Sequence, residues 1–401
     1  MTAPLPFDDA LAIVLAAVPA PEPARESILE AIGLSLSADV VADRDAPPFD
    51  ASAMDGFAVR AADAVAGATL AVHGEIAAGA WPERAVGAGE AIAIMTGAPV
   101  PGGADAIVPV EDVERRGDEI VVCEAAVAGR HVRRRGEIRI AGAVVLPAGH
   151  VLRAIDASIL AVVGCARVPV YARPMVAVGA TGDELVPVEV PPERGEIRNS
   201  NTPALMAQAR AAGALATTLG IIRDDPAETR RAIAQGLERE LLVLSGGVSR
   251  GEHDHVVAAL EAEGVEILFH RVAMKPGQPI AFGRRGRTLV FGLPGNPVSA
   301  WLGFELFVRP VIRKRLGFAD PTRRSVRARA VEAMRGAGAR RAFLPAAWDA
   351  SANEVCLVPW RGSHDPFGLA AANALAVVPE NRAIAAGDLV EVIPIGSATT
   401  P

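Results

Sequence analysis

Cysteine is scarce in this sequence. The three cysteines, Cys123, Cys165 and Cys356, are far apart and odd in number. A disulfide framework needs paired cysteines, and a structural zinc site needs closely spaced ligands, so we expect neither. Other residue types must therefore carry the chemistry.

Long apolar stretches are also absent. No run reaches the roughly 18 residues that a membrane-spanning helix requires without a polar interruption. The N-terminus shows no basic segment followed by an apolar one, the pattern that directs secretion. We therefore expect a cytoplasmic protein that does not associate with membranes.

A strongly basic domain is missing as well. The chain has 40 Lys and Arg against 47 Asp and Glu, a formal net charge of −7. Nucleic-acid binders usually present a basic face, so nucleic acid is not an expected partner, and an anionic ligand must be held by local charge. The only dense basic run is Arg130 with Arg133, Arg134 and Arg135. Such a run is typical of a solvated face, with a functional role as the alternative.

Three glycine-containing loops are the most informative feature present. They occupy residues 244–249, 275–279 and 293–297. The first and third loops each follow a short apolar run and precede a helix-like segment. Glycines let the backbone approach a ligand closely, and the N–H groups at a helix start attract negative charge. Because such loops gather at the carboxyl ends of the strands in an open α/β sheet, they predict a pocket for a phosphorylated small molecule.

Carboxylates accompany these loops. Glu184 and Asp224 each follow an apolar run, and Asp254 follows the first loop. Mg²⁺ is usually held by one or two carboxylates together with phosphate oxygens, so a magnesium site is predicted; a helix cap or turn is the alternative for any isolated acid. Asp225 fits that alternative, because Pro226 and Glu228 follow it as in a capping box.

At 401 residues the chain is too long for one core, and we expect two to four domains. Residues 8–42 are predicted as amphipathic helix interrupted by prolines at 19–23, residues 46–136 as short strands, and 154–163 as a helix. A β-rich tail is predicted from about 323 to 393. Between 173 and 318, strands and helices alternate, the pattern of a parallel sheet wrapped by helices. The predicted strands are 175–180, 216–222, 241–244 and 288–291, and the predicted helices are 202–212, 227–237, 254–263 and 298–316.

Several long motifs resemble one known family. The motifs are Phe49-Asp-Ala-Ser-Ala-Met-Asp-Gly-Phe-Ala, Ile94-Met-Thr-Gly-Ala-Pro-Val-Pro-Gly-Gly-Ala-Asp, Thr181-Gly-Asp-Glu-Leu, Asn199-Ser-Asn, Ser245-Gly-Gly-Val-Ser with Gly251-Glu-His-Asp, Lys275-Pro-Gly, and Gly292-Leu-Pro-Gly-Asn-Pro-Val-Ser. In this order they resemble the MoeA/gephyrin E-domain family, whose members insert molybdenum into molybdopterin. The resemblance covers essentially the whole chain.

The resemblance implies a multidomain α/β plus β fold in a homodimer. A discontinuous N-terminal dimerisation domain would comprise residues 1–42 plus 137–168, and a β-rich insert domain would comprise 43–136. The central three-layer α/β domain with a mostly parallel sheet would span 169–319, and a β-barrel-like C-terminal domain would span 320–398. The insert would reach over the active site of the other subunit.

The resemblance also implies roles for individual residues. Glu184 and Asp254 would hold Mg²⁺, Ser245-Gly-Gly would hold the phosphate of adenylylated molybdopterin, and Lys275 would attract molybdate. The catalytic set would be Asp55, Thr96, Glu184, Asp224, Asp254 and Lys275, and the substrate-binding set Ser245, Gly246, Gly247, Arg271, Gly292, Pro294, Gly295, Ser299 and Arg340.

The implied activity is that of a molybdopterin molybdenumtransferase. Such an enzyme takes adenylylated molybdopterin and molybdate, depends on Mg²⁺, and releases AMP with the metal-loaded cofactor. The implied partners are the molybdopterin adenylyltransferase and the acceptor molybdoenzymes.

Four departures from the family pattern leave a rival hypothesis open. Gln278 stands where relatives often have lysine, Pro345 where an arginine is expected, Phe367 and Gly368 where many have paired serines, and Ile138 where an acid is usual. Arg340 or Arg341 could compensate. The changes remove groups that would bind molybdate and leave the phosphate-binding groups intact. The alternative is therefore a non-catalytic paralogue that binds or delivers the cofactor, or scaffolds assembly. An adenylyltransferase of the related single-domain fold is disfavoured by the large extra domains.

Overall fold

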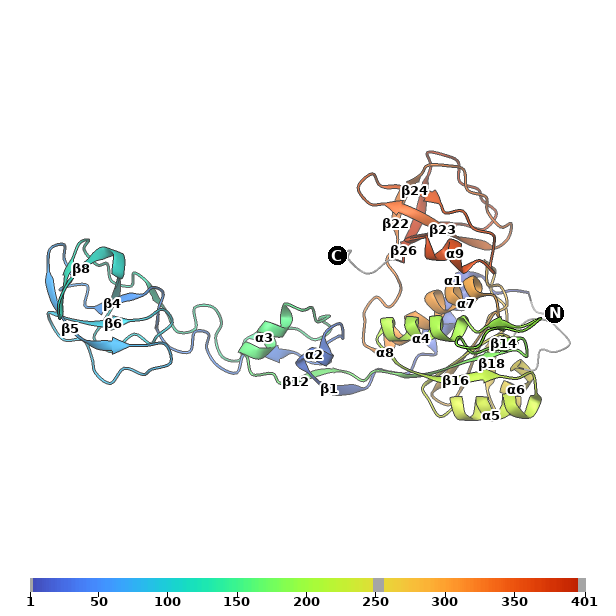
Figure 1. Cartoon of the computed structure of the whole chain (residues 1–401), viewed down its shortest axis with the longest axis horizontal. Coiled ribbons are helices and arrows are strands. Elements are labelled where there is room, and N and C mark those ends of the chain that lie inside the picture. The colour runs from blue at the N-terminus through green and yellow to red at the C-terminus, as the bar shows by residue number, and fades with distance from the viewer. Residues whose placement is uncertain (1–2, 248–255, 396–401) are drawn as a thin grey trace. The chain divides into compact units, whose positions relative to one another are not determined.

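The computed structural model describes residues 3–247 and 256–395, and the chain divides into two compact units (Figure 1). The first unit comprises Met1–Ser37, Gly149–Arg153 and Arg167–Pro401, and the second comprises Ala38–Ala148 and Ala154–Ala166. The four domain ranges expected from the sequence are finer than this division and stay a prediction. Among the described helices, none is long and apolar enough to cross a membrane.

A mixed sheet forms the centre of the first unit. Strands β16, β13, β17 and β21 run parallel to one another, and β20 and β18 extend the sheet in antiparallel fashion. The mostly parallel sheet predicted from the sequence is therefore confirmed. The order across the sheet is β16 (Leu215–Ile222), β13 (Met175–Thr181), β17 (Leu241–Ser245), β21 (Thr288–Leu293), β20 (Ala281–Arg285) and β18 (Glu266–Phe269).

Helices cover both faces of this sheet, which gives the predicted three layers (Figure 1). Helices α5 (Pro226–Gly236) and α6 (Val256–Ala262) pack together on one face, where Ile233, Leu242 and Val290 belong to one buried cluster. Helices α4 (Asn201–Ala212) and α7 (Pro297–Gly303) contact each other on the other face. Burial on both faces explains why the inner parallel strands β13, β17 and β21 are continuous apolar runs.

The predicted cap of α5 is confirmed. The Asp225 carboxylate accepts a hydrogen bond of 2.8 Å from the Glu228 N–H, and Pro226 occupies the first turn. The Glu228 carboxylate accepts from the N–H of Arg223 at 3.3 Å, so the reciprocal bond lies two residues earlier than a regular capping box would place it. Asp225 therefore has a structural role as the N-cap of α5.

The single helix predicted over 298–316 is interrupted. Helix α7 continues into a π-helical turn, η2 (Phe304–Val308), and then into α8 (Arg309–Arg315). The turn contains Glu305, which is buried and accepts from Gln208 of α4 at 3.1 Å, with its other oxygen close to Arg309 and Arg323. This buried ion cluster joins the helix layer to the segment that leads into the C-terminal strands.

A second mixed sheet forms the core of the second unit. Side chains alternate between two buried clusters, with Phe57 and Val59 in one and Ala58, Ile92 and Ile107 in the other. The β-rich character expected for this region is confirmed. The strand order is β7 (Ala106–Pro109), β4 (Gly56–Val59), β6 (Glu90–Ile94), β5 (Thr69–Ile76), β9 (Glu119–Val122) and β8 (Val113–Arg116), and this unit also contains β2 (Val40–Val41), β3 (Ala51–Ser52), β10 (Val132–Arg133), β11 (Val144–Leu146) and α3 (Asp156–Val162).

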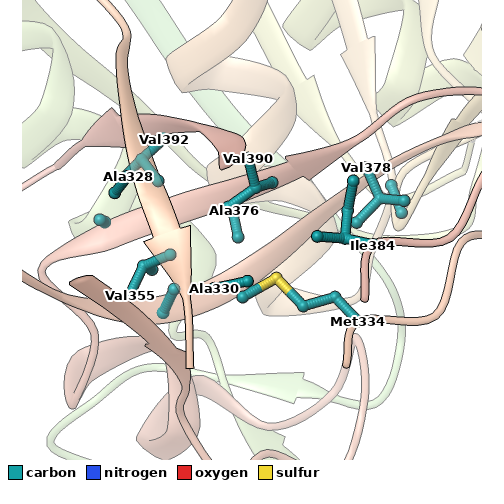
Figure 2. Close-up of a cluster of buried hydrophobic side chains, with 12 residues drawn as sticks. Ala328, Ala330, Met334, Val355, Ala376, Val378, Ile384, Val390 and Val392 are labelled. Carbon is teal, nitrogen blue, oxygen red and sulfur yellow. The ribbon is translucent and has the colours of Figure 1, made fainter. Parts of the chain in front are cut away.

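The C-terminal strands close into a barrel, as predicted. The ring runs β23 (Arg341–Asp349), β24 (Glu354–Leu357), β22 (Val326–Ala330), β26 (Leu389–Pro394) and β25 (Ala374–Val378), and β25 pairs back with β23. Figure 2 shows its small apolar core, in which Met334 packs near Ala330 and Ile384 near Val378. A short strand from the central domain, β19 (Met274–Lys275), pairs in parallel with β23 and so brings Lys275 to the barrel.

The helix predicted over residues 8–42 is correct only for its first part. Helix α1 spans Phe7–Ala16, but β1 (Pro23–Ser27) pairs antiparallel with β12 (Arg167–Tyr171), and only Ile28–Ala31 (α2) is helical after it. The prediction was wrong there because a strand partner about 145 residues away in sequence, invisible to local periodicity, satisfies the backbone of residues 23–27.

Candidate functional site

A cavity of about 610 Å³ lies where β13, β16, β17 and β21 end. Its wall contains residues from the glycine-containing loops at 244–249 and 293–297 and from the turns after β13 and β16. Loops at the carboxyl ends of parallel strands form the ligand site in open α/β sheets, as the sequence predicted. The predicted site residues that line the cavity are Glu184, Asp224, Ser245, Gly246, Gly247, Pro294 and Gly295.

Ser245 ties the two loops together. Its hydroxyl donates to the Pro294 carbonyl at 3.1 Å and accepts from the Asn201 side-chain amide at 2.7 Å. The same amide donates to the Gly295 carbonyl at 2.7 Å, and the Gly246 N–H donates to the carbonyl of Leu293 at 3.0 Å. The Ser245 hydroxyl therefore already has protein partners as donor and as acceptor. We expect the backbone that follows Ser245 to make the contacts with a ligand.

Gly246 and Gly247 form a turn that admits no side chain. Their φ angles are 94° and 63°, in the region that favours glycine. A Cβ at Gly246 would lie 2.6 Å from the Thr181 carbonyl oxygen, and one at Gly247 would lie 2.5 Å from Val256 Cγ2. Nothing in the described part of the chain accepts from the Gly247 N–H, and the buried Thr181 hydroxyl there has no partner. The turn thus presents polar groups at a place that only glycine backbone can occupy.

Glu184 and Asp224 bring two carboxylates to the cavity. The Asp183 carboxylate accepts from the Asp224 N–H at 3.1 Å, and Arg223 donates to the carbonyls of Asp183 at 2.8 Å and Leu185 at 3.3 Å. These bonds fix the turn after β13 to the end of β16. Within the described ranges, neither Glu184 nor Asp224 pairs with an Arg or Lys, so their oxygens suit a hard cation such as Mg²⁺. Asp254, the other predicted metal ligand, lies outside the described residues.

The predicted molybdate residues lie beside the barrel and do not line this cavity. Lys275 is exposed on β19, and Arg340 donates to the Gln278 side-chain oxygen at 3.4 Å. Arg341, the other possible substitute, is held by Asp8 through two bonds of 2.8 Å and by Glu380 at 3.2 Å. Arg340 is therefore the cation that stands next to Gln278. Arg271, Gly292 and the buried Ser299 also lie outside the cavity wall.

Asp55 and Thr96 form a polar pair in the second unit. The Thr96 N–H and hydroxyl donate to the same Asp55 oxygen at 2.6 and 2.8 Å. These two bonds, the backbone one foremost, lower the pKa of Asp55 below its ordinary value. The carboxylate is exposed and ionised at neutral pH, and its other oxygen is free within the described part of that unit.

Asn201 and His364 line the cavity although the sequence assigned neither a role. Asn201 belongs to a motif that carried the family resemblance, but its bridging bonds depend on loops 44 and 94 residues away. His364 lines the cavity from the C-terminal region. The preceding residue, Ser363, accepts from the Asn296 side chain at 3.1 Å and from the Val298 N–H at 3.0 Å, which fixes this segment at the start of α7.

The basic run is mostly neutralised by neighbouring acids. Arg130 pairs with Glu124 at 3.3 Å, Arg134 with Asp50 at 2.7 Å, and Arg135 with Asp45 at 2.5 Å. These partners support the interpretation of the run as a solvated face.

Comparison with known proteins gives a consistent result over the whole chain. The family model of the MoeA N-terminal region (domain I and II) matches residues 5–164, that of the "Probable molybdopterin binding domain" matches 177–314, and that of the MoeA C-terminal region (domain IV) matches 327–395. The family predicted from the sequence motifs is thereby confirmed.

Individual relatives agree. The chain is 38% identical over 385 residues to molybdopterin molybdenumtransferase 2 of Mycobacterium tuberculosis, covering 92% of this chain and 94% of the relative. It is 37% identical over 320 residues to the molybdopterin molybdenumtransferase of Bacillus subtilis, covering 77% and 74%. A crystal structure of a molybdopterin biosynthesis MoeA protein from Pyrococcus horikoshii superposes with a TM-score of 0.79 at 28% identity, covering 98% of this chain and all of that one.

Proposed function

This chain belongs to the MoeA family, and we propose that it is a molybdenumtransferase of molybdenum cofactor biosynthesis. It takes adenylylated molybdopterin and molybdate, and it releases AMP with the metal-loaded cofactor. The observation that carries this proposal is the cavity in which a glycine turn, two free carboxylates and the Asn201 bridge meet.

The glycine turn and its neighbours hold the phosphates. The Gly247 N–H and the Thr181 hydroxyl have no partner among the described residues, and they are donors beside a backbone that a ligand can approach closely. Ser245, Asn201 and the 293–297 loop keep these donors in place. Catalysis of this kind depends mainly on positioning, because bound groups held in a reactive geometry have already lost their freedom of motion.

Glu184 and Asp254 hold Mg²⁺, with Asp224 at the same edge of the sheet. When bound, Mg²⁺ would polarise the phosphoanhydride bond and stabilise the charge that develops as AMP leaves. The carboxylates Glu184 and Asp224 support this role, since both are exposed in the cavity and unpaired in the described chain.

Lys275 and Arg340 attract molybdate. Arg271 and Ser299 of the α/β domain belong with Arg340 to the predicted substrate-binding set. The Arg340 guanidinium beside Gln278 supplies a cation where relatives often have lysine. At Gly368, a Cβ would lie 2.5 Å from Trp360 Cβ, so a serine does not fit this packing. The supply of charge from Arg340 favours the enzyme over a non-catalytic binding paralogue.

The protein acts as a cytoplasmic homodimer. Residues 1–42 and 137–168 form the dimerisation domain, and Asp55 and Thr96 serve the site of the partner subunit. The chain receives its substrate from the molybdopterin adenylyltransferase and passes its product to acceptor molybdoenzymes.

Complementation tests the proposal. A strain that lacks its molybdenumtransferase should regain molybdoenzyme activity when it expresses this chain at low molybdate, and a Lys275→Ala variant should not restore it. If the wild-type chain accumulates and binds AMP, yet restores nothing even at high molybdate, the binding-paralogue hypothesis replaces the enzyme.

A further inference from the structure

His364 is an unassigned imidazole in the cavity wall. It is exposed, it comes from the C-terminal region, and it joins the glycine turn and the two carboxylates around the same space. In the described part of the chain the ring makes no hydrogen bond or ion pair. An exposed polar ring that faces a ligand cavity and has no protein partner is available to a ligand.

The backbone that carries His364 is firmly anchored. On one side, Ser363 is bonded to Asn296 and Val298 at the start of α7. On the other side, the Asp365 carboxylate accepts from the N–H groups of Arg361 at 2.9 Å and Gly368 at 3.2 Å and caps α9 (Pro366–Ala370). These bonds fix the two neighbours of His364 and leave its side chain free.

Gly362 lies close to the ring. Its φ is 113°, and a Cβ there would lie 3.7 Å from His364 Cε1 and 3.8 Å from Nδ1. The imidazole therefore lies on the side of Gly362 where a side chain would otherwise stand. The bonds of Ser363 and Asp365 fix the backbone on both sides of His364, which lowers the entropy lost when the ring binds a ligand.

We propose that His364 contacts the substrate and donates a hydrogen bond to a phosphate oxygen of its nucleotide half. This inference rests on the proposed function and adds to it a residue from the C-terminal region. The alternative anion, molybdate, is disfavoured by position, because Lys275, Arg340 and Arg271 do not line the cavity that His364 lines. Within the described residues, the cavity that His364 lines contains the Gly247 N–H, the Thr181 hydroxyl and Arg198, which are donors suited to a phosphate.

The proposal gives the C-terminal barrel a part in binding. The other charged side chains in the cavity wall are Glu184, Asp224 and Arg198, so Arg198 and His364 are the cationic or potentially cationic groups there. The bonds of Ser363 to Asn296 and Val298 hold His364 beside the start of α7. The barrel thus completes a pocket that is built mainly by the α/β domain.

The test measures the coupling between His364 and the phosphate. The full-length protein with Mg²⁺ is titrated by calorimetry with AMP and, separately, with adenosine, which lacks the phosphate. A charge-assisted hydrogen bond corresponds to roughly ten-fold or more in affinity. His364→Ala should therefore lower the affinity for AMP by about that factor and the affinity for adenosine by less than about two-fold. His364→Gln, which keeps an N–H donor, should recover part of the loss.

Controls separate the possible failures. His73→Ala removes an exposed histidine of the second unit and should change neither affinity, and thermal melting checks that each variant folds. If His364→Ala lowers the affinities for AMP and adenosine equally, or changes neither, the role of His364 is overturned while the proposed function stands. If the wild-type protein binds neither ligand, the proposed function itself fails. A molybdate requirement that rises in His364→Ala with unchanged AMP affinity would assign the ring to molybdate and also refute the proposal.

Discussion

Ser245 and Asn201 show how much a residue's role depends on its partners. A buried hydroxyl must find hydrogen-bond partners, and Ser245, only 1% exposed, finds them in Asn201 and Pro294. The residue type and the loop motif correctly predicted a position in the cavity. The direction of the hydroxyl could not be predicted, because it is set by a helix start and a loop remote in sequence.

Arg340 is the residue on which we expect molybdate binding to depend. Removing its guanidinium beside Gln278 should raise the molybdate concentration needed for half-maximal insertion by about ten-fold or more, because a charge-assisted bond is worth roughly 1.5–3 kcal/mol. The measurement is AMP release as a function of molybdate for Arg340→Ala, with nucleotide affinity expected to stay unchanged.

A second substitution tests whether the charge or the position matters. Gln278→Lys in the Arg340→Ala background should restore most of the lost molybdate affinity, since it returns a cation to the same place. Arg324→Ala, an exposed arginine of the linker before the barrel, serves as the control and should have no effect. An unchanged molybdate requirement in Arg340→Ala would show that Arg340 supports only the packing around Gln278.

At the scale of elements, the N-terminal segment holds the strand that carries Lys275. The Leu5 N–H donates to the Arg271 carbonyl at 2.9 Å, and the Ala273 N–H donates to the Leu5 carbonyl at 2.7 Å. At the start of α1, Asp8 binds Arg341 on the neighbouring strand β23, whose guanidinium lies 5.0 Å from the centre of the Phe7 ring. Residues 5–8 therefore contact the segment that leads into β19 and the strand β23.

Asp8→Asn should weaken this attachment in a pH-dependent way. The hydrogen bonds from Arg341 hold the pKa of Asp8 below its ordinary 3.8, so the pair stabilises the fold above that pH and loses its effect as the pH falls through the lowered value. Because Asp8 is largely exposed, the loss at pH 7 should stay under about 1 kcal/mol.

Urea unfolding midpoints at pH 7 and at about pH 2.5 check this expectation. The midpoint of Asp8→Asn should lie below that of the wild type at pH 7 and approach it in acid, whereas Asp9→Asn, the adjacent exposed acid, should match the wild type at both. A difference that persists in acid would mean that Asp8 acts through packing and not through its charge.

The predicted elements were most accurate where the sequence contains a continuous run of apolar residues. The strands predicted at 175–180, 216–222 and 241–244 end within one residue of β13, β16 and β17. Strands β13 and β17 are buried and therefore form continuous apolar runs, whereas β16 lies at the edge of the sheet and is only partly buried. Strands β18 and β20 were missed, since they form the antiparallel edge of the sheet and β20 ends in exposed arginines. The π-helical turn η2 was missed because Glu305 reads as an exposed helical residue until Gln208, Arg309 and Arg323 surround it.

At the scale of the whole molecule, the predicted site is distributed over segments that local patterns cannot connect. Periodicity predicted the α/β domain and a β-rich tail, and the family resemblance implied that the tail is a barrel. Only the long motifs linked the polar pair Asp55 and Thr96 to the same activity. The structure describes this pair in the second unit and the glycine turn in the first. Their cooperation in one site of a homodimer remains a proposal, and it predicts how inactive subunits behave when they are mixed.

Asp55→Asn and Lys275→Ala should each be inactive alone and recover activity together. If Asp55 serves the partner's site, every heterodimer contains one site with both lesions and one intact site. Random exchange makes half of the dimers heterodimers, so about a quarter of all sites should work. AMP release after subunit exchange measures this, and exchange itself is verified with differently tagged chains.

The matched control places both lesions in the same domain. Glu184→Gln mixed with Lys275→Ala should remain inactive, because both residues belong to the 173–318 region, and no pairing of chains can then produce an intact site. Recovery in that control would mean that activity arises from something other than shared sites, such as contamination or residual activity of a variant. If Asp55→Asn and Lys275→Ala recover nothing after proven exchange, each chain must build its own complete site, and Asp55 and Thr96 then act within the subunit that carries them.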